Sequence, residues 1–295
     1  MKRDVLYSIG KVSKICDVSQ RMLRYYEKIG LIVPDQVDEQ SRYRYYSINT
    51  MQQVQIIRDL VDSGFSMEEI GKILSASDME IFQHMIEGKI DETCEKMRYY
   101  NQRMDSLKSW HEVLVEGQWI LKHRQISITT KYFQNRQHFW YEQEHEPGDS
   151  DALAYLETEY FTMSKRNGHS MVDVGGAFCI LYDKYKERLD NSYKRTVLLQ
   201  LVNANNKSMD SVVDFGGFMV ISGYHIGSLK KVSETYNRLF EWADKHSFRL
   251  RGDSVERHVV DIYSTSNEDN YVTEIMLPVL DDTEAFELVN RYKKV

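Results

Sequence analysis

The feature that most limits the possible folds is a long segment with the pattern of one uninterrupted helix. Residues 78–115 contain no proline, and Gly88 is their only glycine. Apolar or bulky side chains recur at two heptad positions, and charged and amide residues fill the rest, as in a coiled coil. The two positions hold Ile90, Met97, Met104 and His111, and Thr93, Tyr100, Leu107 and Leu114. The pattern predicts a dimerisation helix, although an amphipathic helix packed on its own chain would give a similar stripe.

The composition describes a chain that can bury a sizeable core. It has 295 residues, of which 42% are hydrophobic, so its length allows one large domain or two to three ordinary ones. No apolar run approaches the roughly 18 residues of a membrane helix, and polar residues interrupt the basic N-terminus. Cys16, Cys94 and Cys179 lie far apart without a CxxC pair. This spacing argues against a disulfide framework or a zinc site, and it fits a cytoplasmic protein without a membrane partner.

The charge is unevenly distributed along the chain. The net charge of −7 alone disfavours a nucleic-acid partner. Residues 1–50, however, carry nine Lys/Arg against six Asp/Glu, which is +3 locally and leaves −10 for the rest. The asymmetry is mild, so the geometry of the basic residues has to decide.

Residues 8–47 have the pattern of two helices followed by a hairpin. Residues 8–16 carry apolar side chains on one helical face, and Ser19 is predicted to cap a second helix that ends near Ile29 and Gly30. Pro34 prevents immediate helical continuation, and residues 36–41 are a polar turn. The stretch "RYRYYS" (residues 42–47) alternates as a strand does. Together these elements predict a winged helix-turn-helix.

Two further helices are predicted after the wing. Asn49 and Gln52 resemble a capping box before "MQQVQIIRDLVDSG". Ser66 and Glu69 form a clearer capping box before "MEEIGKIL".

One face of the second helix suits DNA. At about 100° per residue, basic and aromatic side chains form one contiguous stripe, whereas Tyr26 falls on the opposite, core-facing side. The stripe consists of Arg21, Arg24, Tyr25 and Lys28. Its charges can neutralise phosphates, and Arg and Tyr tips can reach base edges in a major groove.

The start of this helix and the wing extend the predicted DNA-binding surface. Free N–H groups around Ser19 and Gln20 suit a phosphate, and at least one of Tyr45 and Tyr46 should turn inward. The predicted backbone contacts of the wing are Arg42, Tyr43 and Arg44. A run of charged residues is usually only a solvent-exposed face. Here the predicted helix caps, the turn and the wing all occur at the spacing of a winged helix-turn-helix, and this agreement favours DNA binding.

From Gly117 onward, strand-like runs alternate with helices. Strand–helix–strand–strand order is clear in residues 217–279 and looser in 125–203, with helices predicted near 150–164, 175–188 and 228–246. The predicted fold class is therefore α+β multidomain. Its parts are a winged helix-turn-helix DNA-binding domain (1–76), a dimerisation coiled-coil helix (77–117) and an α+β domain of two strand-helix-strand-strand pseudo-repeats (118–295).

The first 75 residues resemble the N-terminal domain of the MerR family of transcription regulators. The matching segments are "YSIGKVSKICDVSQRMLRYYEKIGLIVP", "YRYYS" and "MQQVQIIRDLVDSGFSMEEIGKIL". One departure is Arg42, because the family usually has glycine before the Tyr-Arg of the wing. The resemblance implies homodimers formed through a long antiparallel helix pair. It also implies binding to double-stranded promoter DNA whose spacer is too long for RNA polymerase, with activation by bending and untwisting of that DNA.

Residues 118–295 resemble the GyrI-like effector domain of multidrug-responsive MerR regulators, most clearly over 215–280. The best matches are "GGFMVISGYHIGSLKKVSETYNRLFEWADKHSFRL" and "YVTEIMLPV". Metal-sensing and redox-sensing relatives use cysteines after the dimer helix or in a cluster, and residues 105–130 contain none. No metal or other cofactor is therefore expected.

The resemblance places Glu274 in the ligand cavity. A carboxylate buried alone is costly, and a cationic ligand would compensate it, while aromatic faces would stack on a flat ring. The effector is therefore expected to be small, lipophilic and cationic. The candidate walls are Tyr224 and Tyr271 by motif, and Phe139, Trp140, Tyr141, Tyr182, Phe215 and Trp242 by composition. Each of these aromatics could instead belong to the core.

The leading hypothesis is a dimeric, ligand-responsive transcription regulator that is not an enzyme. Two alternatives remain. The GyrI-like domain could act as a hydrolase of small reactive compounds, or it could bind a protein partner while the DNA-binding domain acts as a plain repressor. No nucleophile–base pair stands at a suggestive spacing.

Overall fold

The computed structural model describes residues 5–76, 78–124, 127–148, 152–166, 174–202 and 212–280. The chain divides into two compact units, residues 1–98 and 99–295. Helix α5 (Met79–His123) contributes its first part to one unit and the remainder to the other. Within the described ranges, no helix is both long enough and apolar enough to cross a membrane.

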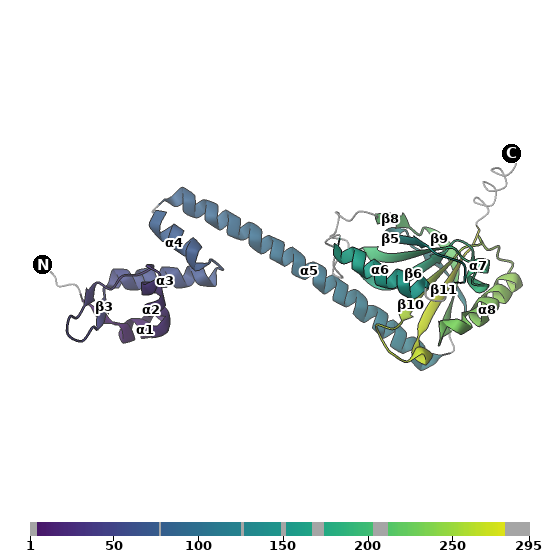
Figure 1. Cartoon of the computed structure of the whole chain (residues 1–295), viewed down its shortest axis with the longest axis horizontal. Coiled ribbons are helices and arrows are strands. Elements are labelled where there is room, and N and C mark those ends of the chain that lie inside the picture. Colours follow the sequence, from purple (N-terminus) through teal and green to yellow (C-terminus); the bar gives the residue numbers. More distant parts are fainter. Residues whose placement is uncertain are drawn as a thin grey trace. The chain divides into compact units, whose positions relative to one another are not determined.

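The N-terminal unit is a winged helix-turn-helix, as predicted (Figure 1). Its helices are α1 (Ile9–Cys16), α2 (Gln20–Lys28), α3 (Ile48–Asp62) and α4 (Met67–Ala76). Its strands are β1 (Tyr7–Ser8), β2 (Gln36–Val37) and β3 (Arg44–Tyr46), in the antiparallel order β1-β3-β2. The sequence does not predict β1, which has only two residues. Apolar side chains from the four helices and β3 form one core.

Capping residues define the ends of these helices largely where the sequence predicts them. Ser19 Oγ accepts a hydrogen bond from Met22 N (3.1 Å) at the start of α2. Gly30, just past the end of α2, has a φ of +79°, which side chains with a Cβ rarely adopt. Ser66 and Glu69 cap each other before α4, with Ser66 N donating to Glu69 Oε2 (2.6 Å) and Glu69 N to Ser66 Oγ (3.2 Å).

The predicted cap of α3 is wrong. Ser47 rather than Asn49 is the N-cap, and its Oγ accepts from Thr50 N (3.3 Å). Ser47 N and Thr50 Oγ1 both donate to Asp35 Oδ2 (2.7 Å each). Helix α3 therefore begins at Ile48, earlier than predicted. Asp35, from the turn before the wing, accepts the hydrogen bonds from Ser47 and Thr50 that hold this helix start in place.

The two Tyr-Tyr pairs divide between core and surface, as predicted. Tyr26 is 3% exposed, whereas Tyr25 is 42% exposed. In β3, Tyr46 is fully buried and Tyr45 is half-buried.

Helix α5 extends past the predicted 78–115 range to His123, and it carries two different faces. Large residues of the predicted heptad stripe are exposed in the single chain, among them Met97 (61%), Tyr100 (62%) and Leu107 (58%). A second stripe packs on the C-terminal sheet, with Ile120 buried against the sheet. Gly117, which the sequence suggested as the start of a new region, lies inside this second stripe.

Gly117 allows a close approach between α5 and the sheet. A Cβ at this position would overlap Val260 Cγ2. The glycine therefore serves helix–strand packing rather than a helix end.

The C-terminal unit is built on an antiparallel sheet with the order β4-β9-β11-β10-β6-β7-β5-β8. Its strands are β4 (Thr129–Phe133), β5 (Arg136–Glu144), β6 (Val174–Tyr182), β7 (Arg195–Val202), β8 (Val212–Phe215), β9 (Phe218–Ile226), β10 (Ser254–Val260) and β11 (Val272–Pro278). Its other helices are α6 (Ala152–Arg166), α7 (Tyr185–Leu189) and α8 (Val232–Lys245), with short 3₁₀ turns η1 (Leu229–Lys231) and η2 (Glu268–Asn270).

Two repeats of strand-helix-strand-strand order make up most of this sheet, as predicted. The first is β5-α6-β6-β7, and the second is β9-α8-β10-β11. In each repeat the first strand pairs with the third, and the third pairs with the second. The repeats join where β6 pairs with β10.

The first repeat departs from the sequence prediction in two places. The helix predicted near 175–188 is wrong, because residues 174–182 form β6 and only the short α7 follows. Strand β6 is buried on both faces, so its apolar residues do not alternate, and periodicity cannot separate it from a helix. The sequence also misses β5. The strand predicted at the start of residues 125–203 is β4 instead, and β4 pairs with β9 of the second repeat.

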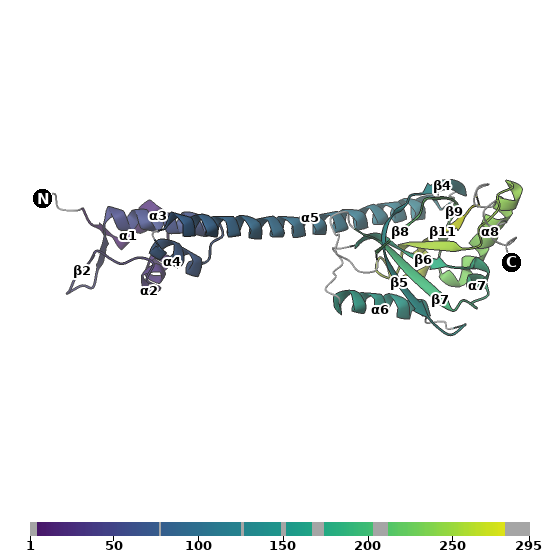
Figure 2. The same cartoon turned by 90° about the horizontal axis from the view of Figure 1, so that it is seen from above.

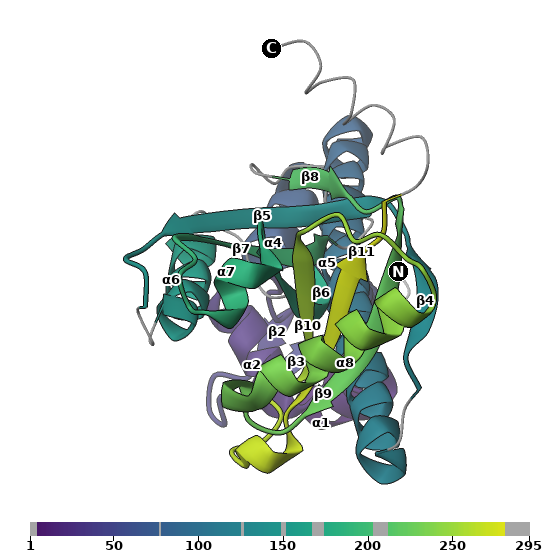
Figure 3. The same cartoon turned by 90° about the vertical axis from the view of Figure 1, so that its right-hand side faces the viewer.

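Helices cover both faces of the sheet. Helix α6 lies on the side of the strands opposite to α5 (Figure 2), and α8 crosses that same side with α5 behind the sheet (Figure 3). The α6 and α8 side holds two of the apolar clusters. The α5 side holds another apolar cluster and the charged residues described below.

A row of six side chains crosses the α5 side of the sheet. In strand order it consists of Trp140, Leu199, Cys179, Arg257, Glu274 and Tyr224. The first three belong to the first repeat and the last three to the second, at equivalent positions of the register. One half of the row is therefore apolar, and the other half is charged or polar.

Candidate functional site

The exposed face of α2 carries the predicted DNA contacts together. Arg21, Arg24, Tyr25 and Lys28 are all exposed, whereas Leu23 is fully buried on the other side of the helix. The spacing of these four residues on a single helix sets them in one stripe. The structure therefore holds four potential contacts on one rigid element.

The start of α2 adds to this face. Ser19 and Gln20 are exposed, and Ser19 Oγ uses one of the free N–H groups of the first turn. The remaining N–H groups keep the partial positive charge of a helix N-terminus, which suits a phosphate oxygen.

The wing residues differ in how free they are. Arg42 and Tyr43 are exposed near the tip. Arg44, by contrast, is held by Glu27 of α2, with its Nε 2.8 Å from Glu27 Oε1. This hydrogen bond and the charge of Glu27 raise the pKa of Arg44. Arg44 therefore fixes the wing to α2, and a phosphate would have to share its guanidinium with Glu27.

Arg42 is strained by its backbone conformation. Its φ of +59° lies in the left-handed region, which costs a residue with a Cβ roughly 1–2 kcal/mol. Arg42→Gly is expected to raise the free energy of unfolding by about 0.5–1 kcal/mol, because relief of this strain exceeds the added chain entropy. The same substitution should reduce the salt dependence of DNA binding, because one cation is lost. Urea unfolding and binding at several salt concentrations measure the two effects.

Arg42→Lys is the matched control for this substitution. It keeps both the charge and the strain, so stability and salt dependence should stay close to those of the unmodified chain. A glycine variant that is less stable than the lysine variant would contradict the strain argument.

Glu274, the predicted ligand carboxylate, is already neutralised within the chain. Its side chain is 1% exposed, and Arg257 Nε lies 2.8 Å from its Oε2. Lys131 Nζ and Ser222 Oγ both donate to its Oε1. Burial would raise the pKa of Glu274, but Arg257 and Lys131 outweigh burial and hold that pKa below its usual range. A cation can therefore pair with Glu274 only by replacing one of these two side chains.

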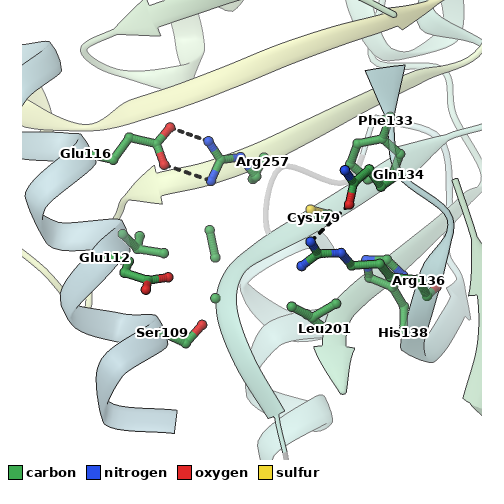
Figure 4. A pocket seen from close by; sticks show the side chains of 13 residues that line it. Ser109, Glu112, Glu116, Phe133, Gln134, Arg136, His138, Cys179, Leu201 and Arg257 are labelled. Atoms are coloured by element: carbon green, nitrogen blue, oxygen red, sulfur yellow. Dashed lines mark hydrogen bonds and ion pairs between the residues drawn. The ribbon is translucent and has the colours of Figure 1, made fainter. Parts of the chain in front are cut away.

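Arg257 also connects Glu274 to helix α5. Its guanidinium donates to both carboxylate oxygens of Glu116, with Nη1 3.1 Å from Oε2 (Figure 4). Tyr224 Oη donates to Glu116 Oε1 (2.8 Å), and burial raises the pKa of Tyr224, which keeps its hydroxyl a donor. A continuous charged network thus runs from α5 through β10 to β11.

A cavity of about 340 Å³ lies between α5 and this face of the sheet. Ser109, Glu112 and Glu116 line it from α5, and Arg136 lies across from them, with its Nη2 bound to Gln134 Oε1 (3.0 Å; Figure 4). The other lining residues are Val113, Phe133, His138, Gly176, Ala177, Cys179, Leu201 and Arg257. This first cavity therefore combines an apolar floor with the charged network.

A second cavity of about 250 Å³ adjoins the first, and the two share Val113, Gly176 and Ala177. Gly176 belongs to the irregular part of β6, where the register with β7 shifts between Gly175 and Cys179. The other lining residues are Trp110, Leu114, Phe178, Gln200, His258, Val259, Asp261, Tyr263 and Ser264. Its walls are mostly apolar and aromatic.

Several predicted aromatic walls pack in the core instead. Phe139 and Tyr182 join the cluster around Leu156 of α6. Trp242 stacks on Phe248 (5.6 Å between ring centroids) beside α8. None of these three aromatics lines either of the two cavities.

The other predicted walls lie at intermediate positions. Tyr224 is the one that reaches the Glu274 network, through Glu116. Trp140 Nε1 donates to Glu142 Oε2 (2.9 Å), and Tyr141, Phe215 and Tyr271 are half-buried outside both cavity linings. Of the predicted set, the structure brings Tyr224 into the network of Glu274, through Glu116 and Arg257, but not the remaining aromatics.

The sequence also misses the partners of Glu274. Lys131, Ser222, Arg257 and Glu116 come from three strands and a helix, and Lys131 lies 143 residues from Glu274. No local motif marks them. Across the residues that the structure describes, no group of three or more His, Cys, Asp or Glu side chains is arranged to hold a metal ion.

Comparisons with known families match both parts of the chain. Residues 7–77 match the MerR HTH family regulatory protein, and residues 136–280 match the GyrI-like small molecule binding domain.

The chain is also similar to curated relatives and to a solved structure. The multidrug-efflux transporter 1 regulator of Bacillus subtilis is 40% identical over 79 residues, which are 27% of each chain. The multidrug-efflux transporter 2 regulator of the same species is 21% identical over 300 residues, covering 95% of this chain and 99% of that protein. The solved EcmrR–DNA complex covers 92% of this chain and 99% of that one, at 20% identity and a TM-score of 0.40.

The chain spans 27% to 46% of the length of the first curated relatives that it matches. The match to the MerR HTH family covers the winged helix-turn-helix, whereas the match to the GyrI-like domain covers the repeats of the C-terminal unit. The chain therefore combines one segment that matches the MerR HTH family regulatory protein with a second that matches the GyrI-like small molecule binding domain.

Proposed function

We propose that the chain is a dimeric, ligand-responsive transcription regulator of the cytoplasm. It binds double-stranded promoter DNA with an over-long spacer, and binding of a small lipophilic, cationic effector lets RNA polymerase use that promoter after the DNA is bent and untwisted. The proposal assigns DNA binding to residues 1–76, dimerisation to 77–117 and effector binding to 118–295. Similarity to the two Bacillus subtilis relatives, both named as regulators of multidrug-efflux transporters, supports it.

The observation that carries the DNA-binding part is the exposed stripe on α2. Arg21, Arg24 and Lys28 bring three cations to one helix face, with Tyr25 between them. A recognition helix in a major groove needs such a face, because phosphates and base edges lie within reach of its long side chains. The exposed wing tip and the helix N-terminus would position the helix on the backbone.

The dimer proposal rests on the unpartnered stripe of α5. Large apolar side chains such as Met97, Tyr100 and Leu107 are about 60% exposed along one side of the helix. A contiguous apolar stripe of this kind is usually covered by another surface. A second copy of the same helix would bury it at heptad spacing.

The effector proposal rests on the cavities between α5 and the sheet. Glu116 of α5 is held by Arg257 and Tyr224 of the sheet. A ligand that changes the partners of Arg257 would therefore also change the hold on α5. A cationic effector that pairs with Glu274 must replace Arg257 or Lys131 there, and replacement of Arg257 would also alter its bonds to Glu116.

A hydrolase function has less support at these cavities. A thiol lies at the floor of the first cavity, that of Cys179. Burial raises its pKa to about 12, so the thiol stays protonated and unreactive at neutral pH.

The test is transcription and footprinting in vitro on DNA that the protein selects from a random pool. A panel of lipophilic cations should change the reactivity of the spacer and increase transcription by RNA polymerase. An unchanged footprint with every cation, including those that bind the protein, would contradict ligand-responsive activation.

A further inference from the structure

Lys89 occupies a position on α5 where helical periodicity predicts an apolar side chain. Phe82 and Met85 pack against the core of the N-terminal unit from the first turns of this helix. The next residue on the same face, four positions after Met85, is Lys89, whose side chain is 13% exposed. All other residues of the stretch 86–98, which the structure describes in full, are exposed. Lys89 is therefore the last side chain of this stretch that packs against the N-terminal unit.

The ammonium group of Lys89 joins α5 to the start of α4. Its Nζ lies 2.7 Å from Glu92 Oε2 on α5 and 3.3 Å from Glu69 Oε2 on α4. Glu69 is also the residue that caps α4 together with Ser66. The same Nζ lies 5.3 Å from the ring centroid of Phe65, which is 7% exposed in the core. One cation thus connects α5 to a helix cap and to a core ring, and we call these four residues (Phe65, Glu69, Lys89 and Glu92) the Lys89 joint.

The carboxylates of the Lys89 joint stay charged at neutral pH. Hydrogen bonds from Lys89 and then from Lys96 lower the pKa of Glu92 to about 2. Hydrogen bonds from Ser66 lower the pKa of Glu69. Ion pairs that are partly exposed add little to folding stability, because water screens them. The joint is therefore expected to fix the direction of α5 rather than to stabilise the fold.

The direction of α5 matters because the helix is long. The exposed heptad stripe runs from Ile90 to Leu114, and its middle lies about 20 Å along the helix from Lys89. A change of roughly 10° at the joint would move the winged helix-turn-helix by roughly 3–4 Å relative to that middle, close to the rise of one base pair. In a dimer whose axis passes through the middle of the stripe, the two recognition helices would move apart or together by up to twice that distance.

We propose that Lys89 is a positioning residue that fixes the angle between α5 and the winged helix-turn-helix, and thereby sets the separation of the two DNA half-sites that the dimer reads. The inference rests on the dimerisation and DNA-binding parts of the proposed function. It requires no effector. Lys89 itself does not lie on the α2 stripe, so its effect should appear in the spacing of the half-sites rather than in their recognition.

The test measures binding of the full chain to a series of DNA duplexes by fluorescence anisotropy. Each duplex carries two half-sites of the DNA that the protein selects from a random pool, at the selected separation or moved by two base pairs in either direction. The unmodified chain should lose at least about tenfold in affinity at the changed separations. Lys89→Met keeps the apolar stem and removes the ammonium group. It should bind the selected duplex within about threefold of the unmodified chain and should lose only about threefold at the changed separations, because a looser joint adapts to them.

Lys96→Met is the matched control. Lys96 lies two turns further along α5 and also binds Glu92 (2.6 Å), but its side chain is 66% exposed. This variant should keep the steep dependence on separation. Lys89→Arg retains a cation for Glu69 and Glu92 and should keep it as well. A duplex with a single half-site should bind the unmodified chain and Lys89→Met equally, because the contacts of α2 are untouched.

A Lys89→Met variant that depends on separation as steeply as Lys96→Met would overturn the proposal while the proposed function stands. A loss of affinity that is equal at every separation, or that appears on the single half-site, would also overturn it, because Lys89 would then serve only to keep the domain folded. An unmodified chain that binds every separation equally would instead contradict the dimeric DNA binding on which the inference rests.

Discussion

Replacing Arg257 with leucine is expected to lower the free energy of unfolding by about 3–5 kcal/mol at neutral pH. Arg257 is shared by Glu274 and Glu116. Its removal leaves Glu274, at 1% exposure, with Lys131 as its one remaining cation. Urea unfolding of the full chain, followed by circular dichroism, measures the loss.

The loss should shrink as the pH falls. In the unmodified chain the pKa of Glu274 lies below its usual range. Its pairing therefore adds stability at neutral pH that is lost as the pH falls through that lowered value. In the leucine variant, burial is no longer offset by Arg257, so Glu274 takes up a proton at a higher pH. The two stabilities should converge toward acid pH.

The double variant Arg257→Leu/Glu274→Leu is the control for this prediction. It removes both buried charges, and Lys131 is 40% exposed and can reach water. Most of the stability should return, because no charge is left buried alone. A single Arg257→Leu variant as stable as the unmodified chain would mean that the network contributes little to the fold.

The second large effect is expected at the proposed DNA-binding face of α2. Arg21→Ala combined with Arg24→Ala should weaken binding to selected DNA by at least about a hundredfold, because each arginine contact contributes roughly 1–3 kcal/mol. The slope of log affinity against log salt should fall by about 2, one unit for each lost phosphate contact. Fluorescence anisotropy at several salt concentrations measures both.

The control removes two exposed cations elsewhere. Lys186→Ala combined with Arg238→Ala changes the net charge equally, on α7 and α8. DNA binding should remain close to that of the unmodified chain. If both double variants lose the same affinity, general charge rather than the stripe on α2 accounts for binding.

The N-terminal unit was predictable because its signals are local. Ser19, Gly30, and the Ser66 and Glu69 pair each act within one helical turn, and each lies where the sequence predicts. The error at Asn49 has a nonlocal cause, since Asp35 holds Ser47 across the wing. Local capping rules do not include such a partner.

The C-terminal unit was less predictable because its contacts depend on strand register. The apolar run of β6 is buried on both faces and therefore lacks the alternation that identifies a strand. Lys131 and Arg257 meet Glu274 only after β4, β9, β11 and β10 pair. The motif around Glu274 predicts a buried carboxylate, but it carries no information on which side chains neutralise it.

The role of Gly117 was also not predictable from the local sequence. A glycine inside a helical pattern normally suggests an interruption. Here it gives Val260 room to approach the helix, a requirement set by a strand more than a hundred residues later in the chain.

The row of six side chains across the sheet shows how two similar repeats can form a binding surface whose two ends differ. Two equivalent halves would offer a ligand two identical ends, and a molecule could lie in either orientation. Once one half holds Cys179 and Leu199 while the other holds Arg257 and Glu274, the two orientations differ in energy. Different side chains at equivalent positions of the two repeats therefore give the row a direction.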